Sequence, residues 1–136
     1  MASSAPPGLT PADRVRLTEA LERRRAELRR DVRAQLDGTD DDRVVGLRRR
    51  LEENDDWGVA DGVAELDIAE VRHALAELTE VDAALDRVRD NTYGICVDCE
   101  ESIAPARLTA YPTAHRCITC QETFETRHRP PSAGAR

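Results

Sequence analysis

Apolar residues recur every three or four positions along the first long segment of the chain, from about residue 11 to residue 53. Such spacing is typical of one face of an amphipathic helix. The stripe consists of Leu17, Leu21, Leu28, Val32, Leu36, Val44, Leu47 and Leu51. Thr10 followed by Pro11 predicts where this helical segment begins. Because the stripe stays in phase across Gly38, one long helix, straight or kinked, is favoured, although a C-cap at Gly38 and a new N-cap at Thr39 or Asp40 describe two helices equally well.

A second stripe has a mean spacing of about 3.5 residues, which is the period of a coiled coil. It consists of Ala64, Ile68, Val71, Leu75, Leu78, Val81, Leu85 and Val88. Between the stripes, Asn, Asp and Gly are concentrated in residues 54–62, which predicts the tip of a helical hairpin. We therefore expect an antiparallel coiled-coil hairpin over residues 11–90, in which residues 61–90 pair with about residues 23–53.

The chain has four cysteines, arranged as two C-x-x-C pairs that are separated by 17 residues. They are Cys96, Cys99, Cys117 and Cys120. Two such turns supply four thiolates in the tetrahedral arrangement that Zn²⁺ prefers, and four protein ligands leave no position for a reactive water. The spacing predicts one structural zinc ion. Thiol redox chemistry and disulfide bonds are the alternatives, but residues 1–8 show neither a basic start nor an apolar run typical of a secretory signal.

The zinc segment is expected to form a small four-cysteine finger over residues 91–127. Its apolar groups are too few to hold it folded without metal. Gln121–Arg127 predicts a short closing helix that lays Phe124 against the base of the hairpin. Residues 1–10 and 128–136 are predicted to be disordered. The predicted fold is therefore mainly α: a long hairpin, then a zinc finger with a short C-terminal helix.

Composition and charge narrow the possible functions of the chain. Of 136 residues, 35% are charged and 3% are aromatic, and all of the basic charge comes from Arg. The net charge is −7, and residues 54–90 hold 3 Arg against 11 acidic residues, a local charge of −8. This balance argues against sequence-independent DNA binding, and no apolar stretch is long enough to span a bilayer. We expect a cytoplasmic monomer. The sequence contains no phosphate-binding Gly loop and no nucleophile paired with a His base, so we do not expect an enzyme.

The finger resembles the DksA/TraR family of bacterial proteins that bind RNA polymerase directly. The residues that carry the resemblance are Tyr93-Gly94-x-Cys96-x-x-Cys99, Ile103-x-x-x-Arg107-Leu108-x-Ala110-x-Pro112-Thr113-Ala114 and Cys117-Ile118-x-Cys120. The resemblance implies a coiled coil that enters the polymerase secondary channel and places acidic tip residues near the catalytic centre, without contacting a DNA sequence. A zinc-dependent protein–protein adaptor and a thiol redox sensor remain alternative functions.

Two parts of the sequence depart from the family pattern, the predicted tip and the position after Cys99. The family's tip motif, Asp-x-x-Asp-x-Ala, falls on Glu53, Asp56 and Gly58 when the sequence is counted back from the first cysteine, and Trp57 adds an aromatic side chain. The resemblance implies that these residues face the polymerase active centre. The second departure is Glu100, which follows Cys99 where the family usually has Gly. If that backbone position is left-handed, Glu costs roughly 1 kcal/mol there.

Overall fold

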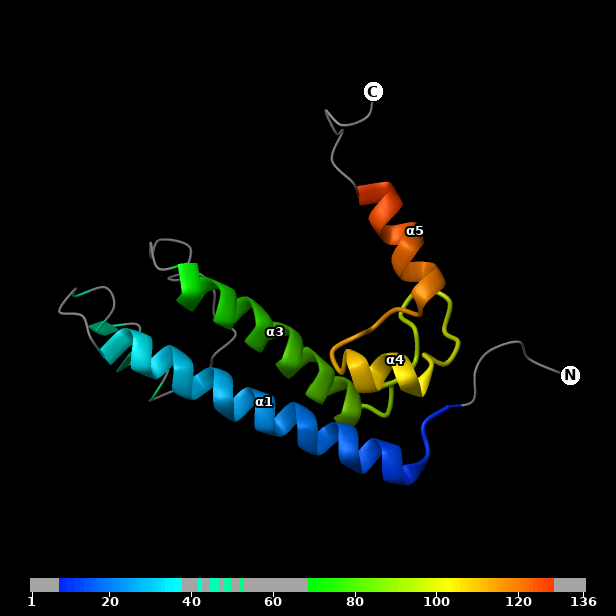
Figure 1. The fold of residues 1–136 in the computed structure, drawn as a ribbon, viewed down its shortest axis with the longest axis horizontal. Helices are drawn as coiled ribbons and strands as arrows, with labels where there is room; N and C mark the ends of the chain where they lie inside the picture. Colours follow the sequence, from blue (N-terminus) through cyan, green and yellow to red (C-terminus); the bar gives the residue numbers. More distant parts are fainter. Residues whose placement is uncertain are drawn as a thin grey trace, which may run out of the picture.

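The computed structural model describes residues 8–37, 42, 45–46, 48–49, 52 and 69–128. Within these residues the named helices are α1 (Pro11–Asp37), α3 (Ala69–Arg89), α4 (Pro105–Ala110) and α5 (Ile118–His128), which Figure 1 labels. The same residues contain one isolated antiparallel β-bridge, between Ile95 and Ser102. The predicted mainly α fold is confirmed.

Helix α1 begins where the sequence predicts, because Thr10 and Asp13 satisfy each other's backbone amides. The Asp13 amide donates to the Thr10 hydroxyl at 3.0 Å, and the Thr10 amide donates to the Asp13 carboxylate at 3.2 Å. Pro11 occupies the first helical position, where a missing N–H costs nothing. This reciprocal cap fixes the N-terminal end of the helix.

Helices α1 and α3 pack against each other along the two predicted stripes. Leu28 and Val32 of α1 lie beside Val71 of α3, whereas Leu21 lies beside Val81, so the helices run antiparallel. The buried residues of α1 are Leu17, Leu21, Leu28, Val32 and Leu36, and those of α3 are Val71, Leu75, Leu78, Val81, Ala84 and Leu85. Both stripes are thus confirmed within the described residues. Val44, Leu47, Leu51, Ala64 and Ile68 lie outside them.

The pairing register differs from the expected one. Pairing residues 61–90 with 23–53 would place Arg24 opposite the C-terminal end of α3, near residue 89. Instead, Arg24 Nε lies 2.6 Å from Glu77 Oε2, and Arg25 Nη1 lies 3.8 Å from Asp82 Oδ1. The expected register is wrong because it assumed two straight arms of equal length, counted from a tip at 54–62.

A single straight helix through Gly38 is also excluded. Arg48 Nη1 lies 2.8 Å from Asp37 Oδ1. A straight α-helix would separate the Cα atoms of residues 37 and 48 by about 16 Å, farther than these two side chains can bridge. The contact therefore excludes a straight helix from Asp37 to Arg48, and it fits both a kinked helix and two separate helices. Residues 38–41 lie outside the described part of the chain.

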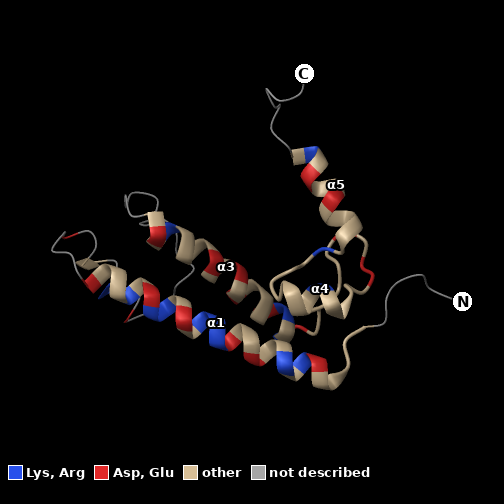
Figure 2. Cartoon of the chain, in the orientation of Figure 1, with Lys and Arg blue, Asp and Glu red and all other residues tan. Residues whose placement is uncertain are grey.

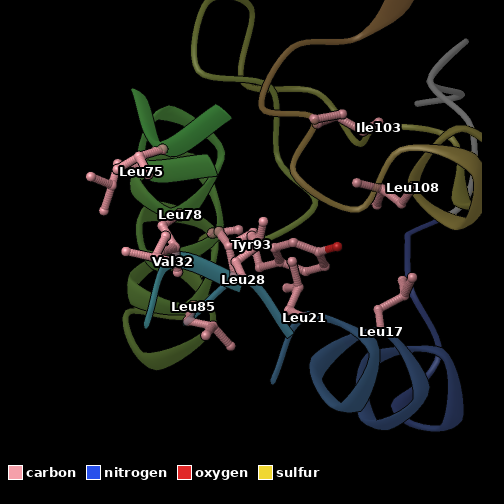
Figure 3. Packing of buried hydrophobic residues seen from close by; sticks show 14 of the residues in the cluster. Leu17, Leu21, Leu28, Val32, Leu75, Leu78, Leu85, Tyr93, Ile103 and Leu108 are labelled. Atoms are coloured by element: carbon pink, nitrogen blue, oxygen red, sulfur yellow. The ribbon is translucent and has the colours of Figure 1, made fainter. Parts of the chain in front are cut away.

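The core of the helix pair continues into the cysteine segment, as Figure 3 shows. Tyr93 lies between the two parts, with Leu21 on one side and Ile103 and Leu108 on the other. Tyr93, Ile103 and Leu108 are each at most 1% exposed. Because these residues belong to the same cluster as Leu17 and Leu21, the finger and the base of the helix pair share one hydrophobic core.

The expected disorder of residues 1–10 is wrong for its last residues. Leu9 packs against the core cluster. A Cβ atom added to Gly94 would lie 3.0 Å from Leu9 Cδ1, so Leu9 covers the backbone at this glycine. Arg16 Nη1 also donates to the Thr109 hydroxyl of α4 at 3.3 Å. The N-terminal end of α1 is thereby attached to the finger.

Helix α5 projects away from the helix pair, as Figure 1 shows, and it has no buried residues. The expectation that Phe124 packs against the base of the hairpin is wrong. The guanidinium carbon of Arg116 lies 4.0 Å from the centre of the Phe124 ring, and this ring stacks on His128 at the same centroid distance. A cation–π contact within the finger holds Phe124 instead.

Candidate metal centre

The end of α3 turns the chain sharply toward the first cysteine pair. Asn91 adopts the left-handed conformation, with a φ of 62°, and the amides of Thr92 and Tyr93 donate to the Arg87 carbonyl oxygen at 2.9 and 3.1 Å. This arrangement satisfies the last carbonyl groups of the helix. Gly94, with a φ of 86°, then completes the turn that Leu9 covers. Asn and Gly are the residues that adopt such angles at least cost.

The first cysteine turn runs from Cys96 to Glu101. The Glu100 amide donates to the Cys96 carbonyl at 3.0 Å, and the Cys96 amide donates to the Glu101 carbonyl at 2.8 Å. Glu100 has a φ of 65°, so the suspected left-handed position exists and carries a side chain that disfavours it.

The second cysteine turn begins helix α5. Cys117 directly precedes the helix, and Cys120 lies in its first turn. The Cys120 amide points at Cys117 Sγ, with an N–S distance of 3.4 Å. A hydrogen bond of this kind helps to hold a ligand sulfur in a fixed position.

The fold brings all four cysteines together. Their sulfur atoms lie within 4.8 Å of one another, and Cys99 Sγ lies 3.8 Å from Cys117 Sγ. A tetrahedron with Zn–S bonds of about 2.3 Å has S–S edges of about 3.8 Å. A disulfide bond requires about 2.05 Å instead, and the four thiols are free. The arrangement fits a closed metal site and not a disulfide framework.

The thiols also strongly influence one another's ionisation. Burial alone would raise the pKa of Cys96, but the backbone amides of Cys99, Cys117 and Asp98 lower it to about 6. In contrast, the neighbouring thiol of Cys117, together with partial desolvation, raises the pKa of Cys120 to about 12. Four thiolates this close repel one another unless a cation lies among them. A bound divalent soft metal would permit all four to be deprotonated.

An ion pair and a backbone hydrogen bond outside the four-cysteine motif join the two turns, and the sequence analysis missed both. Arg116 Nε donates to Asp98 Oδ2 at 2.8 Å, and the Val97 amide donates to the His115 carbonyl at 2.9 Å. The only sequence signal is that opposite charges lie beside or between the cysteines of the two turns. The His115 ring lies outside the sulfur cluster, where its Nε2 is 2.8 Å from Arg116 Nη1.

The four sulfurs together can hold a metal with no ligand position left over, which suits a structural role. The predicted tip residues Glu53, Asp56, Trp57 and Gly58 lie outside the described residues. In the part of the chain that the structure describes, no helix has both the length and the apolar character needed to cross a membrane.

Comparison with known proteins identifies similar sequences and folds. Residues 91–125 match the family model of the prokaryotic dksA/traR C4-type zinc finger. A 52-residue segment is 44% identical to the RNA polymerase-binding transcription factor DksA of Caulobacter vibrioides. A 70-residue segment is 30% identical to an uncharacterized 8.5 kDa protein of Escherichia phage 186 and covers 93% of that protein. The transcription factor DksA2 of Pseudomonas aeruginosa has a similar fold, with a TM-score of 0.60 and 26% identity over 88% of each chain.

The sequence match to the Caulobacter protein is partial. It covers 38% of this chain and 37% of the Caulobacter protein, so the chain spans little more than a third of the length of this curated relative. The match with the Pseudomonas structure extends the similarity to most of the chain.

Proposed function

Because this chain belongs to the DksA/TraR family, we propose that it binds RNA polymerase and regulates transcription. The observation that carries this proposal is the combination of the four-cysteine cluster with an antiparallel helix pair on one shared core. The similar fold of the Pseudomonas transcription factor, over 88% of the chain, supports it. The role is binding and not catalysis, because four thiolates would fill the coordination shell of the metal.

We propose that Cys96, Cys99, Cys117 and Cys120 bind one Zn²⁺ ion with a structural role. The sulfur spacing and the need to balance four neighbouring thiolates support this ligand set. Metal binding would fix the two turns on which the finger depends, since the free energy of binding is also folding free energy in small zinc domains.

The charge distribution supports a proposal about which part of the chain acts on the polymerase. Figure 2 shows Arg and acidic residues interspersed along α1, which has 8 Arg and 6 acids, whereas α3 has 3 Arg and 5 acids. The two helices together are therefore neutral. Residues 53–68, which include the predicted tip at 54–62, contain 6 acidic residues and no Arg. The acidic excess of the chain is thus concentrated in and beside the predicted tip.

We propose that this acidic region enters the secondary channel of the polymerase and acts near its catalytic centre, with Glu53 and Asp56 as the acting carboxylates. A negatively charged segment suits a channel lined by basic groups, since complementary charge guides association. Trp57 would add contact area, because Trp is enriched at interface positions that contribute most to binding. Gly58 would give the predicted turn more backbone freedom than the Ala typical of the family.

The direct test is binding of the purified, zinc-loaded chain to core RNA polymerase, with a bare promoter duplex as the comparison at physiological salt. The expected result is binding to polymerase and no binding to the duplex. Binding to the duplex without binding to polymerase would contradict the proposal and indicate a DNA-binding finger. Binding to neither would favour a zinc-dependent adaptor for another protein.

A further inference from the structure

Asp98 and Arg116 lie in different cysteine turns and form an ion pair between them. Asp98 lies between Cys96 and Cys99, and Arg116 directly precedes Cys117. We propose that Arg116 is a positioning residue, which holds the two cysteine turns and helix α5 in the arrangement that zinc binding requires. The role has two parts, because the guanidinium contacts the first turn on one side and α5 on the other.

The first part of this role is the link between the turns. The Arg116 Nε–Asp98 Oδ2 distance is 2.8 Å, across 18 positions in the sequence; the Arg116 side chain is 16% exposed and the Asp98 side chain is 47% exposed. A hydrogen-bonded ion pair with one largely buried partner contributes more than a fully exposed pair. The link involves no sulfur, so it can hold the two turns near each other before the metal enters.

The second part is the contact with α5. The Arg116 guanidinium lies over the Phe124 ring at 4.0 Å, one turn beyond Cys120. Phe124 in turn stacks on His128. Helix α5 has no buried residue that could fix it against the rest of the protein. The stack of Arg116, Phe124 and His128 therefore stabilises the part of α5 that lies beyond Cys120.

Neighbouring groups fix the guanidinium in one orientation. Arg107 Nε donates to the Arg116 carbonyl oxygen at 3.0 Å, which holds the backbone, and Arg116 Nη1 lies 2.8 Å from His115 Nε2. Only the planar guanidinium can direct Nε to a carboxylate, direct Nη1 to a ring nitrogen and present its face to an aromatic ring.

Positioning and simple electrostatics predict opposite effects for the loss of Asp98. Zinc binding releases protons from thiols and leaves four thiolates around a divalent ion, so the site becomes more negative. A nearby carboxylate disfavours that change, and electrostatics alone therefore predicts that Asp98→Ala tightens zinc binding. If Asp98 acts by holding Arg116, the same substitution weakens zinc binding.

The experiment measures the zinc dissociation constant of the full chain by competition with a chromophoric chelator. We expect Asp98→Ala and Arg116→Ala each to weaken binding by about tenfold, as for other groups that orient metal ligands. The double variant should bind zinc about as weakly as Arg116→Ala, because the two substitutions break the same Arg116–Asp98 ion pair. Arg127→Ala, which removes an exposed arginine from α5, is the control and should leave the zinc dissociation constant unchanged.

This role rests on the proposed zinc site, so the unsubstituted chain is titrated first. If that chain binds no zinc, the site itself is contradicted. If it binds zinc and Asp98→Ala binds equally or more tightly, only the positioning role of Arg116 is overturned.

Phe124→Leu separates the two parts of the role and leaves the link between the turns intact. It should keep the zinc dissociation constant within about twofold of the original value, since it touches no ligand and no ion pair. Amide hydrogen exchange in residues 121–128 should become severalfold faster, because the contact that orders the helix is lost. Unchanged exchange in this segment would overturn the proposed contact with α5.

Discussion

The hydroxyl group of Tyr93 donates a hydrogen bond to the carbonyl oxygen of Pro112 at 2.7 Å, across the interior of the finger. Tyr93 follows the end of α3, whereas Pro112 follows α4, so the bond joins the helix pair to the loop that leads to the second cysteine turn. Burial of the ring raises the pKa of the Tyr93 hydroxyl to about 12. The residue therefore anchors the finger while remaining a neutral donor.

Tyr93→Phe should lower the free energy of unfolding by about 1 kcal/mol, because it removes one buried hydrogen bond and keeps the ring in place. Chemical denaturation of the zinc-loaded chain measures this change. Tyr111→Phe is the matched control, since the Tyr111 residue is 53% exposed, and it should have little effect. Equal losses in the two variants would show that the Tyr93–Pro112 bond contributes nothing specific.

Glu100→Gly should stabilise the zinc-loaded chain by about 1 kcal/mol, because it relieves a left-handed backbone position at a φ of 65°. Thermal unfolding measures the gain. The control is Glu101→Gly, at the next residue, where φ is not positive and glycine should destabilise through its greater freedom in the unfolded chain. A loss of stability in Glu100→Gly would mean that the Glu100 side chain makes a stabilising contribution larger than the strain.

Glu77 connects pH to the pairing of α1 and α3. The hydrogen bond from Arg24 lowers the pKa of Glu77 below the ordinary value of 4.5. A carboxyl group with a lowered pKa in the folded state contributes stability above its unfolded pKa, and that contribution is lost as pH falls through the folded pKa. Glu77→Gln should therefore cost up to about 1 kcal/mol at pH 7, a modest value because both side chains are partly exposed, and almost nothing in strong acid.

Urea unfolding at several pH values, in zinc-free buffer with matched protein concentration, measures the Glu77 contribution. Glu22→Gln removes another exposed acid from the surface of α1 and serves as the control. The difference in unfolding free energy between Glu77→Gln and the original chain should shrink as the pH falls below 4. If it stays constant, the contribution of Glu77 does not come from its ion pair with Arg24.

Metal removal should loosen more than the finger. Tyr93, Ile103 and Leu108 share one cluster with Leu17 and Leu21, so unfolding the finger uncovers the N-terminal end of α1 as well. After treatment with a chelator, amide hydrogen exchange should rise in residues 91–117 and in the first three turns of α1, while the part of α1 around Leu28 and Val32 stays protected. Full protection of the start of α1 in the metal-free chain would show that the two cores are independent.

Much of this fold follows from local sequence signals. The buried positions of α1 and α3 follow from hydrophobic spacing, and the start of α1 follows from Thr10, Pro11 and Asp13, because a helix cap involves only neighbouring residues. The four-cysteine cluster was equally predictable. Each C-x-x-C turn brings two sulfurs together locally, and a tetrahedral metal site needs four sulfurs, so the two turns must meet.

The register of α1 against α3 was not predictable, because it depends on the path of the chain between them. The ion pair of Asp37 with Arg48 shows that this path is not one straight helix. The role of Arg116 was also missed, since its contacts with Asp98 and Phe124 join residues with no periodic relation. The spacing of cysteines specifies the ligands, but it does not specify which side chains orient them.

The last prediction separates docking on the polymerase from action on transcription. If the finger and helix pair supply most of the contact area while the acidic region acts near the catalytic centre, Asp56→Asn should keep binding to polymerase within about twofold but remove most of the transcriptional effect. Asn has nearly the same size and turn preference as Asp, so the substitution removes a charge without a separate effect on folding. Glu53→Gln should act in the same direction but less, because its longer side chain is less fixed.

Competition binding and single-round transcription on the same protein preparations decide between the outcomes. A loss of affinity in step with the loss of activity would mean that Asp56 is only a binding contact. An unchanged transcriptional effect would show that the altered tip motif, with Glu53 and Gly58 in place of Asp and Ala, does not act through this carboxylate, and the acting group would then have to be sought among the other acids of residues 54–68.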